Sequence, residues 1–306
     1  MKRIKVAVLM STYNGEKYIE AQLDSILSQQ RNFDLGIFIR DDASTDQTVA
    51  IIKEYQKTNE NIHLTRGKNL GCNASFFELL KNVSGYNYYA FSDQDDVWME
   101  DKLQSAINAL EKENDNTPLL YGSCSFLTNE QLEKTGITQR QHRKITFYNT
   151  LIQNFLPGHA QVMNEKLRSV LAKSNIDTSK IYYYDSWITN VAAVEGKIIF
   201  DNTPHTYYRQ HSSNEIGYGK GRLSWYKERL KRIKDNQTKK YSQQIDYFIE
   251  KYSNDLSPEY SEEIQKYTNS KTSFFKRIKY ATHSKLYRQR PSETRLFKIM
   301  YAIGLY

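Results

Sequence analysis

The chain has 306 residues, of which 39% are hydrophobic and 13% aromatic, so it is long enough to bury one large core or two smaller ones. Its two cysteines, Cys72 and Cys124, lie far apart, which argues against a disulfide framework or a thiolate zinc site and favours a reducing cytoplasm. The last third carries the net charge of +8: residues 220–306 contain 20 Lys and Arg against nine Asp and Glu, whereas residues 1–219 contain 23 against 26.

The first 101 residues alternate short apolar runs with amphipathic segments, which predicts parallel βαβ units. The first run, at residues 6–10, is too short for a signal peptide, and no run in the chain reaches the ~20 residues that span a bilayer. We expect strands at residues 4–10, 35–40, 62–65 and 88–92, and helices at about 16–29, 46–57 and 73–82.

Each of these predicted strands ends in a polar cluster. The carboxyl ends of parallel strands meet at one edge of a sheet, where ligands bind in open α/β folds, so we expect four loops to form one crevice. The carboxylates of these loops are Asp41, Asp42, Asp93, Asp95 and Asp96, and the hydrogen-bond donors are Ser11, Thr12, Asn14, Arg66 and Asn69.

Three carboxylates within four residues, Asp93, Asp95 and Asp96, repel each other unless a cation neutralises them. Hard oxygen ligands of this kind suit Mg²⁺ or Mn²⁺ that carries a diphosphate. The alternative is an acidic turn in which Asp96 or Asp101 caps the following helix from solvent. Neither GxxxxGK[ST] nor GxGxxG follows a strand, so we expect a metal and side-chain donors, rather than a glycine loop, to hold the phosphates.

Three segments, VLMSTYNG at 8–15, RDDASTD at 40–46 and SDQDDVW at 92–98, resemble in order and spacing the N-terminal signatures of family-2 glycosyltransferases with the GT-A fold. The resemblance implies a Rossmann-like, mostly parallel sheet and an inverting, metal-dependent transfer from a nucleotide-diphosphate sugar. It also implies that Ser11 and Asp42 contact the nucleoside, Asp42 through a pyrimidine base. Asp93-Gln94-Asp95 corresponds to the DxD motif of the family, with Asp95 as the main metal ligand.

The following residues, 102–219, read as an acceptor-binding half. A helix is expected at about 99–111, a strand at 119–126, a mobile polar loop at 128–148 and a helix from about Asn164. Pro157 and Gly158 break the chain before that helix. In the family a small residue here lets the backbone approach the donor sugar, so Gly158 is a candidate donor contact.

Asp185 follows three tyrosines and starts an apolar helical pattern. It is either the N-cap of that helix or a base whose pKa is raised by its aromatic, sugar-stacking surroundings, and the two roles are compatible. An acceptor hydroxyl needs a base to remove its proton, and the position of Asp185 resembles that of the catalytic base in the family.

Two short strands, 197–200 and 206–208, lead to Arg209 and His211. Arginine binds diphosphates through two parallel hydrogen bonds, and a neutral imidazole can complete a metal site. Similar Tyr-Arg-Gln-His segments occur in relatives that add rhamnose to bacterial polysaccharides. The glycines at 217–221 predict a hinge or, equally, a plain linker. We therefore expect a metal site of Asp95, Asp93 and His211, and nucleotide or donor contacts from Ser11, Thr12, Tyr13, Asn14, Asp42, Arg66, Asn69, Asp93, Gln94, Gly158 and Arg209.

The basic tail, 220–306, is expected to be helical, with apolar stripes at residues 225–233 and 245–252. Residues 274–280 and 296–303 combine apolar side chains with Lys and Arg, as in helices that lie on anionic membranes. We expect peripheral contact with the inner face of the cell membrane through residues 270–306. The alternatives are packing on the catalytic part or on a second copy of the chain.

These expectations describe a GT-A catalytic domain at 1–219, with a nucleotide-binding half at about 1–101, and a helical region at 220–306. The expected activity is inverting transfer from dTDP-rhamnose or a UDP-sugar to a glycan or lipid-linked glycan in polysaccharide synthesis. One alternative is a metal-dependent nucleotidyltransferase, which would need a glycine-rich first loop that this chain lacks. A second is a nucleic-acid binder acting through the basic tail, but an acidic crevice would repel phosphates without a metal.

Overall fold

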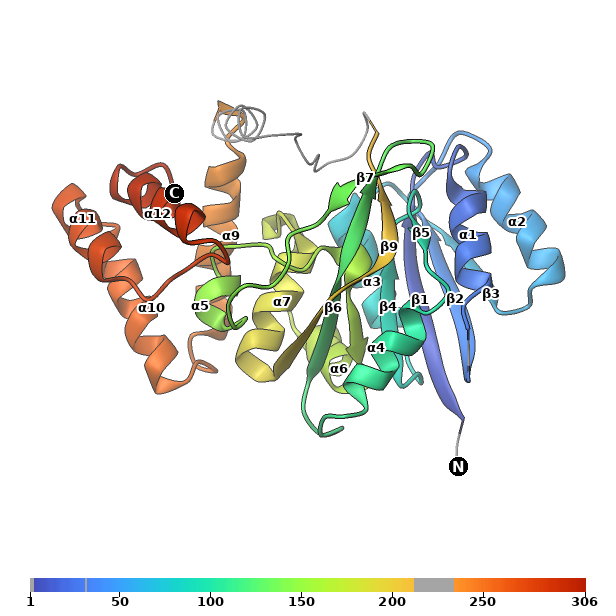
Figure 1. Ribbon diagram of the computed structural model, residues 1–306, viewed down its shortest axis with the longest axis horizontal. Helices are drawn as coiled ribbons and strands as arrows, with labels where there is room; N and C mark the ends of the chain where they lie inside the picture. The colour runs from blue at the N-terminus through green and yellow to red at the C-terminus, as the bar shows by residue number, and fades with distance from the viewer. Residues whose placement is uncertain (1–2, 31, 212–233) are drawn as a thin grey trace.

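The structure is a computed structural model that describes residues 3–30, 32–211 and 234–306 (Figure 1). Its strands are β1 (Ile4–Thr12), β2 (Phe33–Asp41), β3 (Ile62–Arg66), β4 (Tyr88–Ser92), β5 (Val97–Trp98), β6 (Leu119–Thr128), β7 (Lys134–Ile137), β8 (Val162–Asn164) and β9 (Lys197–Arg209). Its helices are α1 (Ile19–Leu27), α2 (Thr48–Thr58), α3 (Cys72–Asn82), α4 (Lys102–Leu110), α5 (Phe147–Thr150), α6 (Glu165–Lys173), α7 (Tyr184–Glu195), α9 (Gln237–Tyr252), α10 (Pro258–Ser270), α11 (Phe274–His283) and α12 (Pro291–Ala302), with short 3-10 turns at Gly158–Ala160 and Thr178–Lys180.

One mixed sheet runs through the molecule in the order β3-β2-β1-β4-β8-β6-β9-β5, with β7 paired to β6. The first four strands pair in parallel as expected, whereas β8 is antiparallel to both β4 and β6. The polar ends of β1, β2 and β4 therefore lie at one edge of the sheet. This α/β architecture with flanking helices confirms the predicted fold class.

Alternate residues of the central strands supply two cores, one on each face of the sheet. Val6, Val8 and Met10 of β1 pack with α1 and α4 on one face, whereas Ala7 and Leu9 pack with α3, α6 and α7 on the other. Continuous apolar runs such as that of β1 are explained by this burial on both faces.

The helices α9–α12 lie at the end of the molecule opposite α1 and α2 (Figure 1). They extend the second core: the Trp187 ring of α7 contacts the rings of Tyr247, Phe248 and Tyr252 in α9, with centroids 5.2–6.0 Å apart. The predicted stripe at 245–252 is thus buried against α7, whereas the stripe at 225–233 lies outside the described residues, as does the glycine-rich segment 217–222.

Two predicted elements differ from the structure. The expected loop at 128–148 contains β7, which has no apolar alternation because all four of its residues are exposed. The two strands expected at 197–200 and 206–208 are one strand, β9, which pairs with β6 through two register shifts. At polar residues 201–203 the register with β6 passes from Asp201 directly to Pro204, so the strand bulges where the apolar pattern is interrupted and continues beyond it.

Candidate active site

A cavity of about 480 Å³ opens where the ends of β1, β2 and β4 meet the start of α7. Asp42, Asp95 and Asp185 all face it, although they lie on three different segments of the chain. The other predicted site residues that line it are Ser11, Tyr13, Asn69, Asp93, Gln94 and Gly158, and its further walls come from Gly71, Cys72, Asn73, Phe76, Pro157, His159, Tyr183, Tyr184 and Tyr208.

The predicted residues Thr12 and Asn14 lie behind this wall and hold the loops together. The Thr12 hydroxyl donates to Asp41 at 3.2 Å, and Asn14 bonds Ser44 and Thr45 through its backbone N–H and its side-chain oxygen, each at 2.9 Å. Asn14 adopts a positive φ of 46°, a conformation that asparagine tolerates better than most residues. These contacts give the two residues a supporting position rather than one on the cavity surface.

The first and fourth loops are joined by Gln94. Its side-chain oxygen accepts from the Tyr13 backbone N–H at 2.9 Å, and its amide nitrogen donates to the Tyr13 carbonyl at 3.0 Å. With its backbone held by these two hydrogen bonds, Tyr13 keeps its ring half exposed at the rim of the cavity.

The carboxylate of Asp42 is fixed by donors on both sides. It accepts from the Leu70 and Gly71 backbone N–H groups at 2.7 and 2.8 Å and forms an ion pair with the buried Arg40. Burial alone would raise the pKa of Asp42, but these donors lower it, so the carboxylate is ionised. Arg66 does not line the cavity: its guanidinium is more than half exposed, 3.8 Å from Asp41.

The acidic loop after β4 brings carboxylates and imidazoles together in two adjacent groups. In one, Asp93, Asp96 and His159 place ligand atoms within 4.8 Å of one another. In the other, Asp95 is hydrogen-bonded to His211 at 2.7 Å. The predicted partners Asp95 and His211 therefore meet, whereas Asp93 lies with two residues that were not predicted as ligands.

Asp96 is fully buried and does not cap the next helix from solvent; Asp101, the other residue of that alternative, is the N-cap residue of α4, although its side chain makes no capping hydrogen bond. Burial, together with the charges of Asp95 and Asp93, raises the pKa of Asp96 well above the ordinary range. One of its oxygens accepts from the Arg209 backbone N–H at 3.1 Å, and its Oδ2 has no hydrogen-bond partner among the described residues. Burial also lowers the pKa of His159 well below its usual value, helped by the Lys102 charge, so its imidazole is neutral.

Arg209 supports the acidic loop from behind. Its guanidinium donates to the backbone carbonyls of Asp95, at 2.8 Å, and Glu130, and it stacks on the Tyr18 ring, which also stacks on His211. The side chain is buried and does not line the cavity.

Asp185 is the second residue of α7 and lies in its first turn. Tyr183, not Asp185, is the N-cap residue of that helix. The Asp185 carboxylate accepts from the Asn154 side chain at 2.9 Å and from the backbone N–H groups of Ser186 and Gly158 at 2.8 and 3.1 Å. Burial outweighs these bonds and raises the pKa of Asp185 to about 6.

Sequence comparison identifies the scaffold that carries these groups. Residues 7–172 match the family model described as glycosyl transferase family 2. The dTDP-rhamnosyl transferase RfbG of Shigella flexneri is 31% identical over 245 residues, which cover 73% of this chain and 83% of that relative. The chain belongs to glycosyl transferase family 2.

Two further relatives are informative. The UDP-Glc:alpha-D-GlcNAc-diphosphoundecaprenol beta-1,3-glucosyltransferase WfgD of Escherichia coli is 31% identical over 150 residues, 49% of this chain and 55% of that one. The crystal structure of S. aureus TarS 1-349 in complex with UDP-GlcNAc superposes with a TM-score of 0.59 at 16% identity, covering 99% of this chain and 89% of TarS. At that identity the likeness to TarS concerns the fold alone.

The residues of this glycosyltransferase fit a divalent cation. Carboxylate oxygens with neutral imidazole suit Mn²⁺ or Mg²⁺, and the buried Oδ2 of Asp96, which has no hydrogen-bond partner among the described residues, is available to such a cation. Lys102, the nearby buried amine, donates instead to the backbone carbonyl of His159 and to the Thr206 hydroxyl, and burial lowers its pKa to about 7 despite the charges of Asp96 and Asp93.

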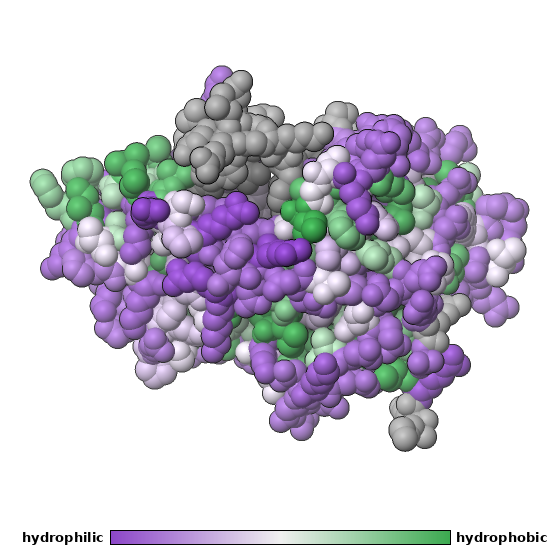
Figure 2. Space-filling view, in the orientation of Figure 1, coloured by the Kyte–Doolittle hydropathy of each residue, from purple (hydrophilic) through white to green (hydrophobic). Residues whose placement is uncertain are grey.

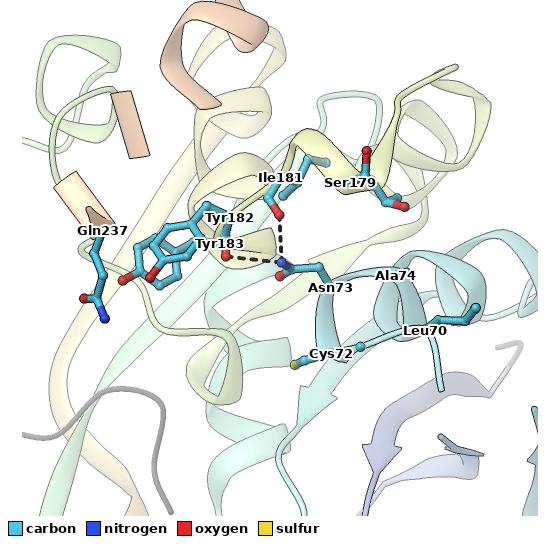
Figure 3. A pocket seen from close by; sticks show the side chains of 11 residues that line it. Leu70, Cys72, Asn73, Ala74, Ser179, Ile181, Tyr182, Tyr183 and Gln237 are labelled. Atoms are coloured by element: carbon cyan, nitrogen blue, oxygen red, sulfur yellow. Dashed lines mark hydrogen bonds between the residues drawn. The ribbon is translucent and has the colours of Figure 1, made fainter. Parts of the chain in front are cut away.

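Sequence reasoning missed Asn73, which joins α3 of the glycosyltransferase to the start of α7. Its amide nitrogen donates to the carbonyls of Ile181 and Tyr182 at 2.8 and 3.2 Å (Figure 3). Its oxygen accepts from the Tyr184 N–H at 3.0 Å. Because these partners lie more than 100 residues away, no local pattern could have revealed this role.

Proposed function

We propose that the chain is an inverting glycosyltransferase that moves a sugar from a nucleotide-diphosphate sugar, dTDP-rhamnose or a UDP-sugar, to a glycan or lipid-linked glycan in cell-surface polysaccharide synthesis. The observation that carries the proposal is the cavity that Asp185 shares with Asp42 and with the acidic loop of Asp93 and Asp95. The names of RfbG and WfgD, a dTDP-rhamnosyl transferase and a UDP-Glc glucosyltransferase, support this class of donor.

In this mechanism Asp185 takes the proton from the acceptor hydroxyl as the hydroxyl oxygen attacks the anomeric carbon. A pKa of about 6 leaves Asp185 ionised at neutral pH yet basic enough to share the proton. Asn154, Ser186 and Gly158 orient its carboxylate. A single displacement inverts the configuration of the sugar.

The proposed donor contacts come from other segments of the chain than Asp185. Asp42, fixed by Arg40 and two backbone N–H groups, is placed to accept a hydrogen bond from a pyrimidine base, with Ser11 beside it in the cavity. Mn²⁺ or Mg²⁺ held by this loop, through Asp95, Asp93 and His211 or through the adjacent group of Asp93, Asp96 and His159, would offset the charge of the leaving diphosphate. Arg209 contributes by positioning the loop that carries Asp95.

Thermal unfolding with a panel of nucleotide sugars, with and without Mn²⁺, tests the donor assignment. Binding to the folded state at 100 times Kd adds about 2.7 kcal/mol of stability, which raises Tm by several degrees. We expect dTDP-rhamnose or a UDP-sugar to give this rise with Mn²⁺, and Asp95→Ala to remove the part that depends on Mn²⁺. If no nucleotide sugar raises Tm but nucleoside triphosphates do, the nucleotidyltransferase alternative is favoured.

We also propose that the exposed face of α11 and α12 contacts the inner face of an anionic membrane. Apolar side chains gather at this end of the molecule (Figure 2), and Phe275 is 80% exposed. In the part of the chain that the structure describes, no helix is long and apolar enough to cross a membrane. Among the described residues, six of the nine exposed large hydrophobic side chains lie here, namely Phe274, Phe275, Ile278, Ile299, Ile303 and Leu305, beside the cations Lys276, Arg277, Lys279, Arg295 and Lys298.

Co-sedimentation with vesicles tests this contact. We expect binding to vesicles that contain phosphatidylglycerol and little binding to pure phosphatidylcholine, because each cation near the surface adds about 1 kcal/mol. Phe275→Asp should weaken binding, whereas Ile137→Asp, on exposed β7, should not. If the chain sediments as a dimer that Phe275→Asp dissociates, the patch is instead an interface between two copies.

A further inference from the structure

A second cavity, of about 660 Å³, opens between the start of α3 and residues 178–183 (Figure 3). Gly71, Cys72, Asn73 and Tyr183 line both this cavity and the one that contains Asp185. The two cavities therefore share a wall, and the second is lined by residues 181–183, directly before the helix that carries Asp185.

The two cavities differ in charge. Four aspartates line the first, whereas no charged side chain among the described residues lines the second. Lys240 is not among the residues that line the second cavity; its ammonium lies 5.6 Å from the centroid of the Tyr182 ring. A diphosphate or an acidic sugar would therefore find no cation among these lining side chains, so the cavity suits a neutral ligand.

The polar groups of the second cavity are hydroxyls and amides, from Ser179, Thr178 and Gln237, and its aromatic groups are Tyr182 and Tyr183. The two rings lie 4.4 Å apart at 54°, so they present differently oriented faces. A ring with an apolar body and a polar tip can cover the C–H face of a sugar, while amides and hydroxyls bind its hydroxyl groups.

This wall is held in place before any ligand binds. Asn73 makes its three hydrogen bonds to the backbone of residues 181–184, and the side-chain oxygen of Gln244 accepts from the N–H groups of both Tyr182 and Tyr183 at 2.7 Å. A preorganised surface loses little entropy on binding, which favours a specific ligand site.

We propose that the second cavity is the acceptor subsite and that it takes an uncharged oligosaccharide, whose terminal hydroxyl reaches Asp185 across the shared wall. This inference rests on the proposed transfer reaction and adds the chemical class of the acceptor. The Tyr182 ring is the surface on which a sugar of that acceptor stacks.

Cysteine alkylation can locate the ligand. Cys72 is exposed and lines both cavities, Cys124 is buried, and Ala74 lines the second cavity alone. The rate of reaction with N-ethylmaleimide is measured by intact mass for a Cys72→Ser, Ala74→Cys double variant, in the presence of neutral di- to tetrasaccharides of rhamnose, glucose or N-acetylglucosamine. Oligosaccharides of equal length that contain glucuronic acid are the matched probes.

We expect a neutral oligosaccharide to slow the reaction about threefold at twice its Kd, because about a third of the sites then remain free. Tyr182→Ala should weaken this protection by about twofold to tenfold, whereas Tyr182→Phe, which keeps the ring, should not. Tyr182 does not line the first cavity, so donor binding should be equal in all these variants.

Two results would overturn the inference: acidic oligosaccharides that protect as well as neutral ones, or no protection by any neutral oligosaccharide while a nucleotide sugar still raises Tm. A protein that binds no nucleotide sugar would instead remove the proposed transfer reaction. The two failures are therefore separate.

Discussion

The Asp185→Asn substitution should stabilise the fold at neutral pH while it stops sugar transfer, because the carboxylate is ionised where it is buried. Burial raises its pKa from an ordinary 3.8 to about 6. At about 1.4 kcal/mol for each pH unit, keeping Asp185 ionised costs the folded state about 3 kcal/mol at pH 8. The amide removes that cost.

Part of the gain is lost in hydrogen bonds. If the asparagine oxygen keeps the bonds from Asn154 and Ser186, its amide nitrogen faces the Gly158 N–H, which then has no acceptor. An unpaired buried donor costs about 1–3 kcal/mol. We therefore expect a net stabilisation of about 0–2 kcal/mol at pH 8.

The pH dependence is the sharper measurement. The folded state holds the Asp185 proton more tightly than the unfolded chain, so this group makes the parent less stable as pH rises through about 6. The variant lacks this loss, and its stability relative to the parent should grow by about 1.4 kcal/mol between pH 5 and pH 8. Urea unfolding at both pH values measures it, and a difference that is the same at both would refute the burial argument.

Although Asp185→Asn should gain stability, it should lose activity. Losing a general base slows transfer by about 10²–10⁴-fold, and in the parent kcat should fall as pH drops below about 6. Nucleotide-sugar binding should be nearly unchanged, since the proposed donor contacts Asp42 and Ser11 lie on other segments of the chain. Asp115→Asn, at an exposed carboxylate between α4 and β6 that lines neither cavity, is the control and should keep the parental rate. A parental rate in Asp185→Asn would exclude Asp185 as the base.

Three other substitutions test the surroundings of the site. Gly158→Ala should reduce kcat, because its Cβ would lie 1.9 Å from the Tyr184 hydroxyl oxygen, and adding Tyr184→Phe should restore part of the rate. Asn73→Ala should lower the free energy of unfolding in urea by about 2–4 kcal/mol, since three hydrogen bonds are lost. Asp96→Asn should raise Tm at pH 8, by removing a buried carboxylate, but weaken Mn²⁺ binding in calorimetry; unchanged Mn²⁺ affinity would exclude Asp96 from the metal site.

The predictability of the strands from sequence depends on their burial. The strands β1, β2 and β4 are buried on both faces, which demands a continuous apolar run that is easy to recognise. The residues of β7 are exposed and need not be apolar, so β7 forms only through backbone pairing with β6. In β9 the strand continues past a bulge at the polar residues, where the side-chain pattern predicted a break between two strands.

The site residues divide in a similar way. Asp42 and Asp95 follow strands, so their place at one edge of the sheet could be predicted from element order, whereas Asp185 was assigned by its resemblance to the catalytic base of the family. His159 could not, because its importance comes from Asp93 and Asp96, more than 60 residues earlier, and from the burial that keeps it neutral. For Arg209 the residue type suggested phosphate binding, whereas the structure uses its donors for two backbone carbonyls.

The contacts of Asn73 imply that Asp42, the proposed donor contact, and Asp185, the proposed base, are positioned by one connected segment. The backbone N–H groups of Leu70 and Gly71 bind Asp42, and Asn73, two residues further on, binds the N–H of Tyr184 directly before Asp185. The Tyr184 ring also stacks on Phe76 of α3 at 4.4 Å. A displacement of the start of α3 would therefore move the donor contact and the base together. Since transfer requires the base to lie in line with the bond that breaks, this shared support preserves their alignment when either end of the cavity is loaded.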